Sequence, residues 1–237
     1  MQQGPVNTNI WYDTKKLQEA LKLFISVSPL YKNSDGYQYD LCDLTRQVMS
    51  NLFHDNQIKF KEAYDRKDLK TIKAISKKQL ELLLDLDGLL SHRSELTFSK
   101  YICDCHKLTA NEDEKRYFDL NARALLTLWG DIRGDCSYLY DYSWREWSGM
   151  VGGFYYKRWD IFYKEIIKNL EKHRKTRILS GDTEVKRKKY RSYKLGEKLY
   201  QFELSFIHEY KEYEYPKDTD VTAYANKMFN KWIEKLV

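Results

Sequence analysis

Residue types that perform catalysis are plentiful in this sequence, but they do not stand at catalytic spacings. The 237 residues contain no G-x-S-x-G nucleophile elbow, no Walker A loop, no G-x-G-x-x-G fingerprint and no H-E-x-x-H zinc motif. Aspartate and glutamate number 35, yet no pair of them stands out as a buried acid and its partner. We therefore expect no catalytic residue within this chain.

Cysteine and histidine, the common metal ligands, are also scattered. The cysteines are Cys42, Cys103, Cys105 and Cys136, and the five histidines form no H-x-x-x-H. No C-x-x-C occurs, and Cys103 and Cys105 would point to different faces of a helix. The pattern predicts no metal site and no cofactor, and it favours buried free thiols.

Aromatic residues are densest between positions 129 and 163, where they exceed what one face of one helix can bury. They are Trp129, Tyr138, Tyr140, Tyr142, Trp144, Trp147, Phe154, Tyr155, Tyr156, Trp159, Phe162 and Tyr163. We expect most of them to form an aromatic core. A Trp at a helix end and a Tyr at the next helix start could instead project from the Gly-containing loop between them. Such a flat wall with a polar tip suits a sugar.

One segment carries the whole basic excess of the chain. Residues 172–194 hold ten Lys or Arg and two acids, a net charge of +8, so the remainder of this +6 chain is −2. The run could bind a polyanion such as nucleic acid or a sulfated glycan, or it could be a solvated loop between helices. Its two aromatic residues, Tyr190 and Tyr193, are too few for a base-stacking platform, which argues against nucleic acid.

The positions of proline indicate the fold class. Pro5, Pro29 and Pro216 are the three prolines, so residues 30–215 contain none. Because proline is costly inside helices and common in the turns of all-β proteins, this stretch predicts an all-α protein. We expect an irregular bundle of about eight helices of uneven length in a single domain over residues 13–237, preceded by a leading segment, 1–12.

Apolar periodicity and capping residues predict where these helices lie. The expected ranges are 13–28, 40–64, 68–90, 96–108, 111–129, 141–172, 193–213 and 219–232. Asp35-Gly36 is expected to form a turn, Asp68 to cap one helix, and Asn111 with Glu114 to form a capping box at another. No stretch is long and apolar enough for a membrane span. The N-terminus lacks a signal peptide, which indicates either a cytosolic protein or part of a longer chain.

Three motifs resemble a known family. Tyr39–Gln47 resembles the signature Y-D-L-x-D-L-T-R-Q, and Asn121–Gly130 resembles N-x-R…L-T-x-W-G. Asp141–Trp159 resembles D-Y-x-x-x-x-W-x-G…Y-Y-x-x-R-W. All three occur, in this order and at similar spacing, in the α-N-acetylglucosaminidases, glycoside hydrolase family 89. The likeness extends from about residue 13 to the C-terminus.

The resemblance implies that this chain is the C-terminal helical domain of a larger retaining glycosidase. In the family, the two catalytic glutamates belong to a (β/α)8-like barrel, so the resemblance places no catalytic residue here. It implies that the domain packs on the barrel of the same polypeptide and lines one side of the pocket for a terminal α-linked N-acetylglucosamine. By motif, Trp129 and Tyr142 match pocket-facing aromatics and Leu139 an apolar pocket position. The family is exported or lysosomal, so the resemblance implies that setting.

This sequence departs from the family pattern after Trp129, where Asp131 replaces a proline and the loop is longer. Two other functions stay open beside the glycosidase domain. One is a free-standing helical module that binds polyanions through residues 172–194, and the other is a helical scaffold without a ligand.

Overall fold

The computed structural model describes residues 9–129, 143–172 and 194–234, and most of these residues are helical. Apart from one isolated bridge between Thr97 and Ser148, the described residues form no β-structure. The predicted all-α class is therefore confirmed. The chain folds into two compact units, which are treated separately below. The α3–α4 unit comprises Thr8–Thr97, Trp147–Gly152 and Pro216–Val237; the α6–α7 unit comprises Phe98–Glu146 and Gly153–Tyr215.

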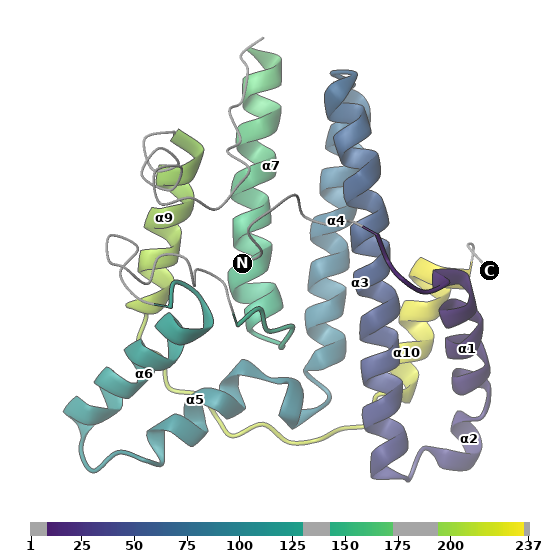
Figure 1. The fold of residues 1–237 in the computed structure, drawn as a ribbon. Coiled ribbons are helices and arrows are strands. Elements are labelled where there is room, and N and C mark those ends of the chain that lie inside the picture. Colours follow the sequence, from purple (N-terminus) through teal and green to yellow (C-terminus); the bar gives the residue numbers. More distant parts are fainter. Residues whose placement is uncertain (1–8, 130–142, 173–193, 235–237) are drawn as a thin grey trace. The chain divides into compact units, whose positions relative to one another are not determined.

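The α3–α4 unit is built on a long helical hairpin, visible in Figure 1. Helix α3 (Asp35–Asp65) and helix α4 (Leu69–Leu90) are joined by a short turn. In that turn Lys67 adopts a left-handed φ of 56°, and the Asp68 amide donates to the Ala63 carbonyl, as in a Schellman helix end. The Asp68 carboxylate accepts from the Thr71 amide and caps α4, as predicted.

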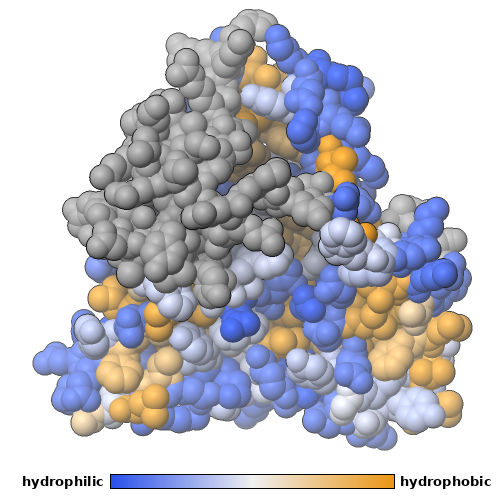
Figure 2. Space-filling model, viewed as in Figure 1, coloured by the Kyte–Doolittle hydropathy of each residue, from blue (hydrophilic) through white to orange (hydrophobic). Residues whose placement is uncertain are grey.

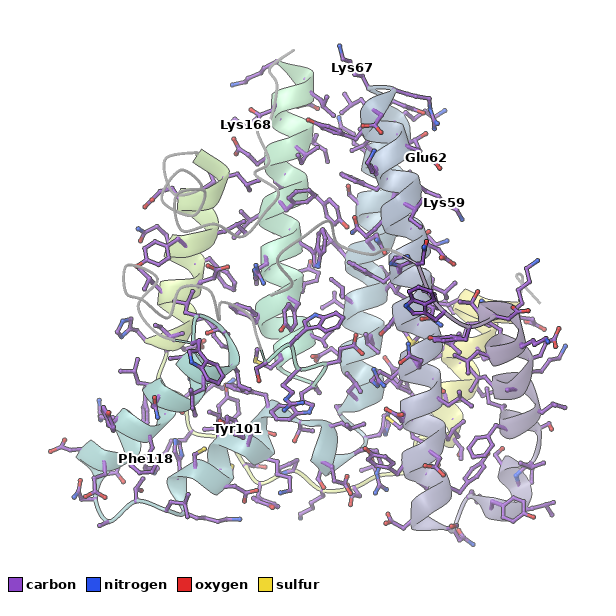
Figure 3. All side chains as sticks on the ribbon, viewed as in Figure 1. Lys59, Glu62, Lys67, Tyr101, Phe118 and Lys168 are labelled. Atoms are coloured by element: carbon purple, nitrogen blue, oxygen red, sulfur yellow. The ribbon has the colours of Figure 1, made fainter. Side chains whose placement is uncertain are left out.

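Exposed charged residues surround this end of the hairpin. Figure 3 shows Lys59 and Glu62 projecting outward from α3 and Lys67 extending from the turn. Inside the hairpin most side chains are apolar, although Thr45, Ser76 and Gln79 are buried as well. The fully buried apolar ones include Leu41, Val48, Met49, Ile72, Leu82, Leu89 and Leu90. The apolar positions predicted at helical spacing therefore lie on the faces by which α3 and α4 pack against each other.

Shorter helices cover the hairpin. Helices α1 (Thr14–Ser26) and α10 (Thr222–Met228) pack on α3 and on each other, and η4 (Phe229–Ile233) continues α10. Between α1 and α3 lies α2 (Ser28–Tyr31), which has Pro29 in its first turn, where no N–H is needed. The expected loop after Pro29 is therefore partly helical. Helix α3 also begins five residues earlier than predicted, because Ser34 caps it.

The segment that leads into α10 is held to α3 and to η1 (Ser94–Leu96) by ionised groups. Asp218 accepts from the Ser94 amide at 2.7 Å, and Asp220 accepts from Gln38 at 3.1 Å. Arg93, whose side chain is buried, pairs with Asp35 at 2.8 Å. Hydrogen bonds therefore hold this connection in place, where few apolar side chains are available.

The α6–α7 unit contains α5 (Phe98–His106), α6 (Glu112–Leu126), α7 (Tyr156–Glu171) and α9 (Lys194–Ile207). Helix α6 packs on α5 and α9, and α9 packs on α7. At the start of α6, Asn111 accepts from the Glu114 amide, and Glu114 accepts from the amide of Ala110. This confirms the predicted capping box, with the reciprocal bond shifted by one residue.

Three further predicted helix boundaries are wrong. The helix expected over 141–172 is not helical at 143–148; it begins as a π-turn, η3 (Val151–Tyr155), and continues as α7. The helix expected to reach Tyr213 ends at Ile207, and the helix expected to reach Trp129 ends at Leu126. The start predicted near Asp141 lies outside the described residues.

Several large apolar side chains lie at the surface of both units. Figure 2 shows apolar residues over the α1–α2 region, where Leu23, Leu30 and Tyr31 are exposed. No helix in the described part of the chain combines the length and apolar character that crossing a bilayer would need.

Candidate functional site

Trp129 lies just beyond the C-terminus of α6, in the α6–α7 unit. Its amide donates to the Ala124 carbonyl at 2.5 Å, and its backbone takes a left-handed φ of 64°. Such a φ is rare for a bulky side chain and is typical of turns and functional sites. The side chain is half-buried. Its contact with a sugar stays a prediction.

A buried ion pair supports this helix end. The Arg123 guanidinium, with none of its side chain exposed, donates from Nε to the Asp119 carboxylate at 2.6 Å. It also donates to the Phe206 carbonyl and to the Tyr213 hydroxyl, at 3.4 and 3.3 Å. The rings of Phe98, Phe206 and Tyr213 surround it. Arg123 thus ties the last turn of α6 to elements far apart in the sequence.

The residues between Arg123 and Trp129 continue this support. Thr127 donates its hydroxyl to the Arg123 carbonyl at 2.7 Å, and Leu126, Thr127 and Leu128 are buried. Ala124, Leu125 and Trp129 are partly exposed. The buried residues of this motif hold in place the helix end that carries Trp129.

The Tyr39–Gln47 motif has a structural role in the α3–α4 unit. Thr45 donates to the Leu41 carbonyl within α3, and Arg46 pairs with Asp43 at 2.9 Å. Gln47 donates to the hydroxyl of Tyr12, which donates in turn to Asn51. These contacts link residues of α3 to one another and to Tyr12.

The third motif is anchored by Asp87 of α4, also within the α3–α4 unit. The Asp87 carboxylate accepts from the amides of Gly149 and Gly152, both at 2.7 Å, and from the Ser148 hydroxyl at 3.3 Å. Gly149 has a φ of 87°, and a Cβ on Gly152 would lie 2.7 Å from the Asp87 carboxyl carbon. The close approach of the carboxylate thus requires glycine at position 152, and the positive φ favours glycine at position 149.

Trp144 was grouped by the sequence with the aromatic core, but the structure exposes it. Its side chain is 70% exposed and its φ is 40°. Phe154 and Tyr163 of the same group are buried, as predicted, and Trp147, Tyr155 and Trp159 are half-buried. No local pattern separates Trp144 from these neighbours. It lies in the segment 143–148, which is not helical.

Two of the predicted pocket residues, Leu139 and Tyr142, lie outside the described residues. The same holds for Cys136 and for residues 173–193 of the basic run. For these positions the expectations stated above remain predictions.

Three carboxylates that the sequence did not single out are buried, and each is paired with a base. Asp119 pairs with Arg123, Glu203 with Arg158 at 3.0 Å, and Glu165 with Lys198 at 2.5 Å. A general acid of a glycosidase needs a raised pKa. At exposed carboxylates, hydrogen bonds instead hold the pKa below its usual range, as at Asp68, Asp104, Glu212, Asp218 and Asp220.

The described cysteines are inert thiols. Burial raises the pKa of Cys42 to about 12, and it also raises the pKa of Cys103 and Cys105. All three are free; Cys42 is buried as predicted, and the other two are half-buried. Within the described ranges, no group of three or more His, Cys, Asp or Glu could hold a metal ion.

The motifs, the helical fold and the supported tryptophan are accompanied by a match to a known family. Residues 1–231 match the model of the α-N-acetylglucosaminidase (NAGLU) C-terminal domain. The chain belongs to this family. The matched range contains all three motifs and nearly all of both units.

A curated relative shows how much of a whole enzyme this NAGLU C-terminal domain represents. The α-N-acetylglucosaminidase of Homo sapiens is 26% identical over 233 residues. The match covers 98% of the chain and 29% of the human protein. The chain therefore spans less than a third of the length of this relative.

Solved structures share the fold of this NAGLU C-terminal domain. The CpGH89 protein of Clostridium perfringens, in complex with its substrate GlcNAc-α-1,4-galactose, superposes with a TM-score of 0.79 at 22% identity. It covers 99% of this chain, which covers 26% of that protein. A family 89 glycoside hydrolase from the same organism, in complex with PUGNAc, gives a TM-score of 0.77 at 22% identity, covering 96% and 25%.

Proposed function

We propose that this chain is the helical domain of a retaining α-N-acetylglucosaminidase, and that it packs on a catalytic barrel and lines one side of the sugar pocket. The family match over residues 1–231 and the 29% share of the human relative support a role as part of a larger enzyme. The catalytic acid and nucleophile are expected in the barrel. The partners are that barrel, in the same polypeptide, and a glycan with a terminal α-linked N-acetylglucosamine.

The observation that carries the proposal is the position of Trp129. A half-buried indole, fixed by the buried Arg123–Asp119 pair and by a left-handed backbone, is a rigid flat surface. Rigid aromatic surfaces bind the apolar face of a sugar with little loss of conformational freedom. We propose that Trp129 contacts the terminal sugar, together with Tyr142 and Leu139.

Replacement of Trp129 in the full-length enzyme tests this role. Trp129→Ala should lower kcat/KM for an aryl α-N-acetylglucosaminide by about tenfold or more, since about 1.4 kcal/mol of lost contact corresponds to tenfold. Trp129→Phe, which keeps a flat ring, should recover part of the loss. Both variants should stay folded by circular dichroism. A Trp129→Ala protein that fails to fold would instead assign Trp129 to the core.

An exported or lysosomal setting is proposed on the family resemblance alone. It predicts a signal peptide in the coding sequence upstream of the catalytic barrel. The alternative of a polyanion-binding module depends on residues 172–194, and no described contact favours it. It predicts binding to heparin that falls steeply with salt concentration, which a titration at two ionic strengths would show.

A further inference from the structure

Trp144 is not a core residue of the described structure. Its side chain is 70% exposed, although tryptophans are highly buried on average. The neighbouring Arg145 is exposed as well, and the segment 143–147 has no regular secondary structure that would orient an indole inward. Binding residues are found disproportionately on irregular segments of this kind.

The backbone of Trp144 adds a second observation. Among described residues other than glycine, only Lys67, Trp129 and Trp144 have a positive φ. The helix end after α3 accounts for Lys67. The two tryptophans both belong to the α6–α7 unit, one directly before residue 130 and the other two positions after residue 142. A left-handed φ is an outlier for a bulky residue, and such outliers gather at functional sites.

We propose that Trp144 is a second sugar-stacking residue, which contacts the sugar that follows the terminal N-acetylglucosamine. This inference rests on the proposed function. A glycosidase that removes a terminal sugar must enclose that sugar, which suits the half-buried Trp129. The next sugar lies at the mouth of the pocket and stays partly solvated, which suits a mostly exposed indole. A neutral aromatic face fits the C–H face of a sugar and demands no charge on it.

The experiment uses the full-length enzyme with Trp144→Ala, Trp144→Tyr and a matched control. Trp11→Ala also removes an exposed tryptophan, 86% exposed, but from the α3–α4 unit. Two quantities are measured for each protein. One is the KM for the disaccharide GlcNAc-α-1,4-galactose, and the other is the inhibition constant of free N-acetylglucosamine, which fills only the terminal-sugar position.

Trp144→Ala should raise the disaccharide KM about five- to twentyfold and leave the inhibition constant of N-acetylglucosamine unchanged. Trp144→Tyr should keep most of the affinity, and Trp11→Ala should match the wild type. An equal rise in both quantities would place Trp144 at the terminal sugar and overturn the proposal. So would an unchanged KM, or a loss of folding that shows the rest of the polypeptide covers Trp144. If the wild type itself cannot cleave α-N-acetylglucosaminides, the proposed function fails first, before Trp144 is tested.

Discussion

Arg123 is the residue on which the end of α6 depends most directly. Its guanidinium is fully buried and satisfies Asp119, which is 2% exposed. Arg123→Met would leave the buried Asp119 carboxylate with only the His106 imidazole, 3.2 Å away, as a partner, and breaking a buried ion pair costs about 3–5 kcal/mol. We expect a loss of that size in the free energy of unfolding, measured by urea denaturation.

An exposed ion pair provides the control for this prediction. Lys61 and Asp65 pair at 2.6 Å within α3, but both side chains are largely exposed. Because solvent screens such a pair, Lys61→Met should leave the free energy of unfolding nearly unchanged. Equal losses in Arg123→Met and Lys61→Met would show that burial of Arg123 is not what matters.

The ionisation of Asp218 should make the stability of the α3–α4 unit depend on pH in the acid range. The Ser94 amide, and then Arg93, holds the pKa of this carboxyl below its ordinary value. The ionised form therefore stabilises the folded state. This contribution is complete above the unfolded-state pKa of about 4 and is lost as pH falls through the lower folded-state pKa.

Asp218→Asn should accordingly lower the free energy of unfolding by about 1 kcal/mol at pH 7, after allowance for the partial exposure of the group. The difference from the wild type should shrink as pH falls below 4. Urea denaturation at pH 7 and pH 3 measures both values. A difference that stays constant, or grows in acid, would be inconsistent with an ionised Asp218 as the stabilising group.

At the scale of elements, two adjacent glycines at the start of η3 should respond differently to substitution. Gly152→Ala would place its Cβ against the Asp87 carboxylate, so that the hydrogen bonds from Gly149 and Gly152 must distort. Over-packing of this kind costs about 1–3 kcal/mol. Gly153 faces open space, so Gly153→Ala should be neutral or stabilise the helix by up to about 1 kcal/mol. Thermal denaturation of both variants measures the contrast, and equal effects would argue against a role for Asp87.

Local signals in the sequence predict the elements whose ends are determined locally. Asp68 and Asn111 cap the helices that follow them, as their residue types indicate. The start of the helix after residue 148 is determined instead by Asp87, about sixty positions earlier in the chain. No local pattern records such a contact, so the sequence placed that helix too early.

In the candidate site, too, features set by nearby residues were predictable and features set by distant contacts were not. A helix end close to Trp129 was predictable, because helix periodicity and the glycine at position 130 mark it, although the helix ends three residues earlier, at Leu126. The burial of Arg123 was not predictable, because arginine is usually exposed and its partners Phe206 and Tyr213 lie more than eighty positions away. The exposure of Trp144 was missed for a similar reason, since a long helix was expected there.

At the scale of the whole molecule, several large apolar side chains of the described residues are exposed to solvent. Trp11, Leu23, Leu30, Leu108 and Trp144 are each at least 70% exposed. If the rest of a larger enzyme covers part of this surface, the isolated chain should bind a hydrophobic dye more strongly, per mole, than the full-length protein. Dye fluorescence at equal molar concentration checks this. Equal or weaker binding by the isolated chain would indicate that the surface is not an interface.

Turnover of an aryl α-N-acetylglucosaminide by the purified 237-residue chain and by the full-length protein, assayed side by side, is the most direct test. The full-length protein should release the aryl group, and the isolated chain, which supplies helices and aromatic residues but no catalytic carboxylates, should release none. Measurable turnover by the isolated chain, or no turnover by a folded full-length protein, would contradict the proposal that this domain lines a sugar pocket whose catalytic carboxylates belong to the barrel.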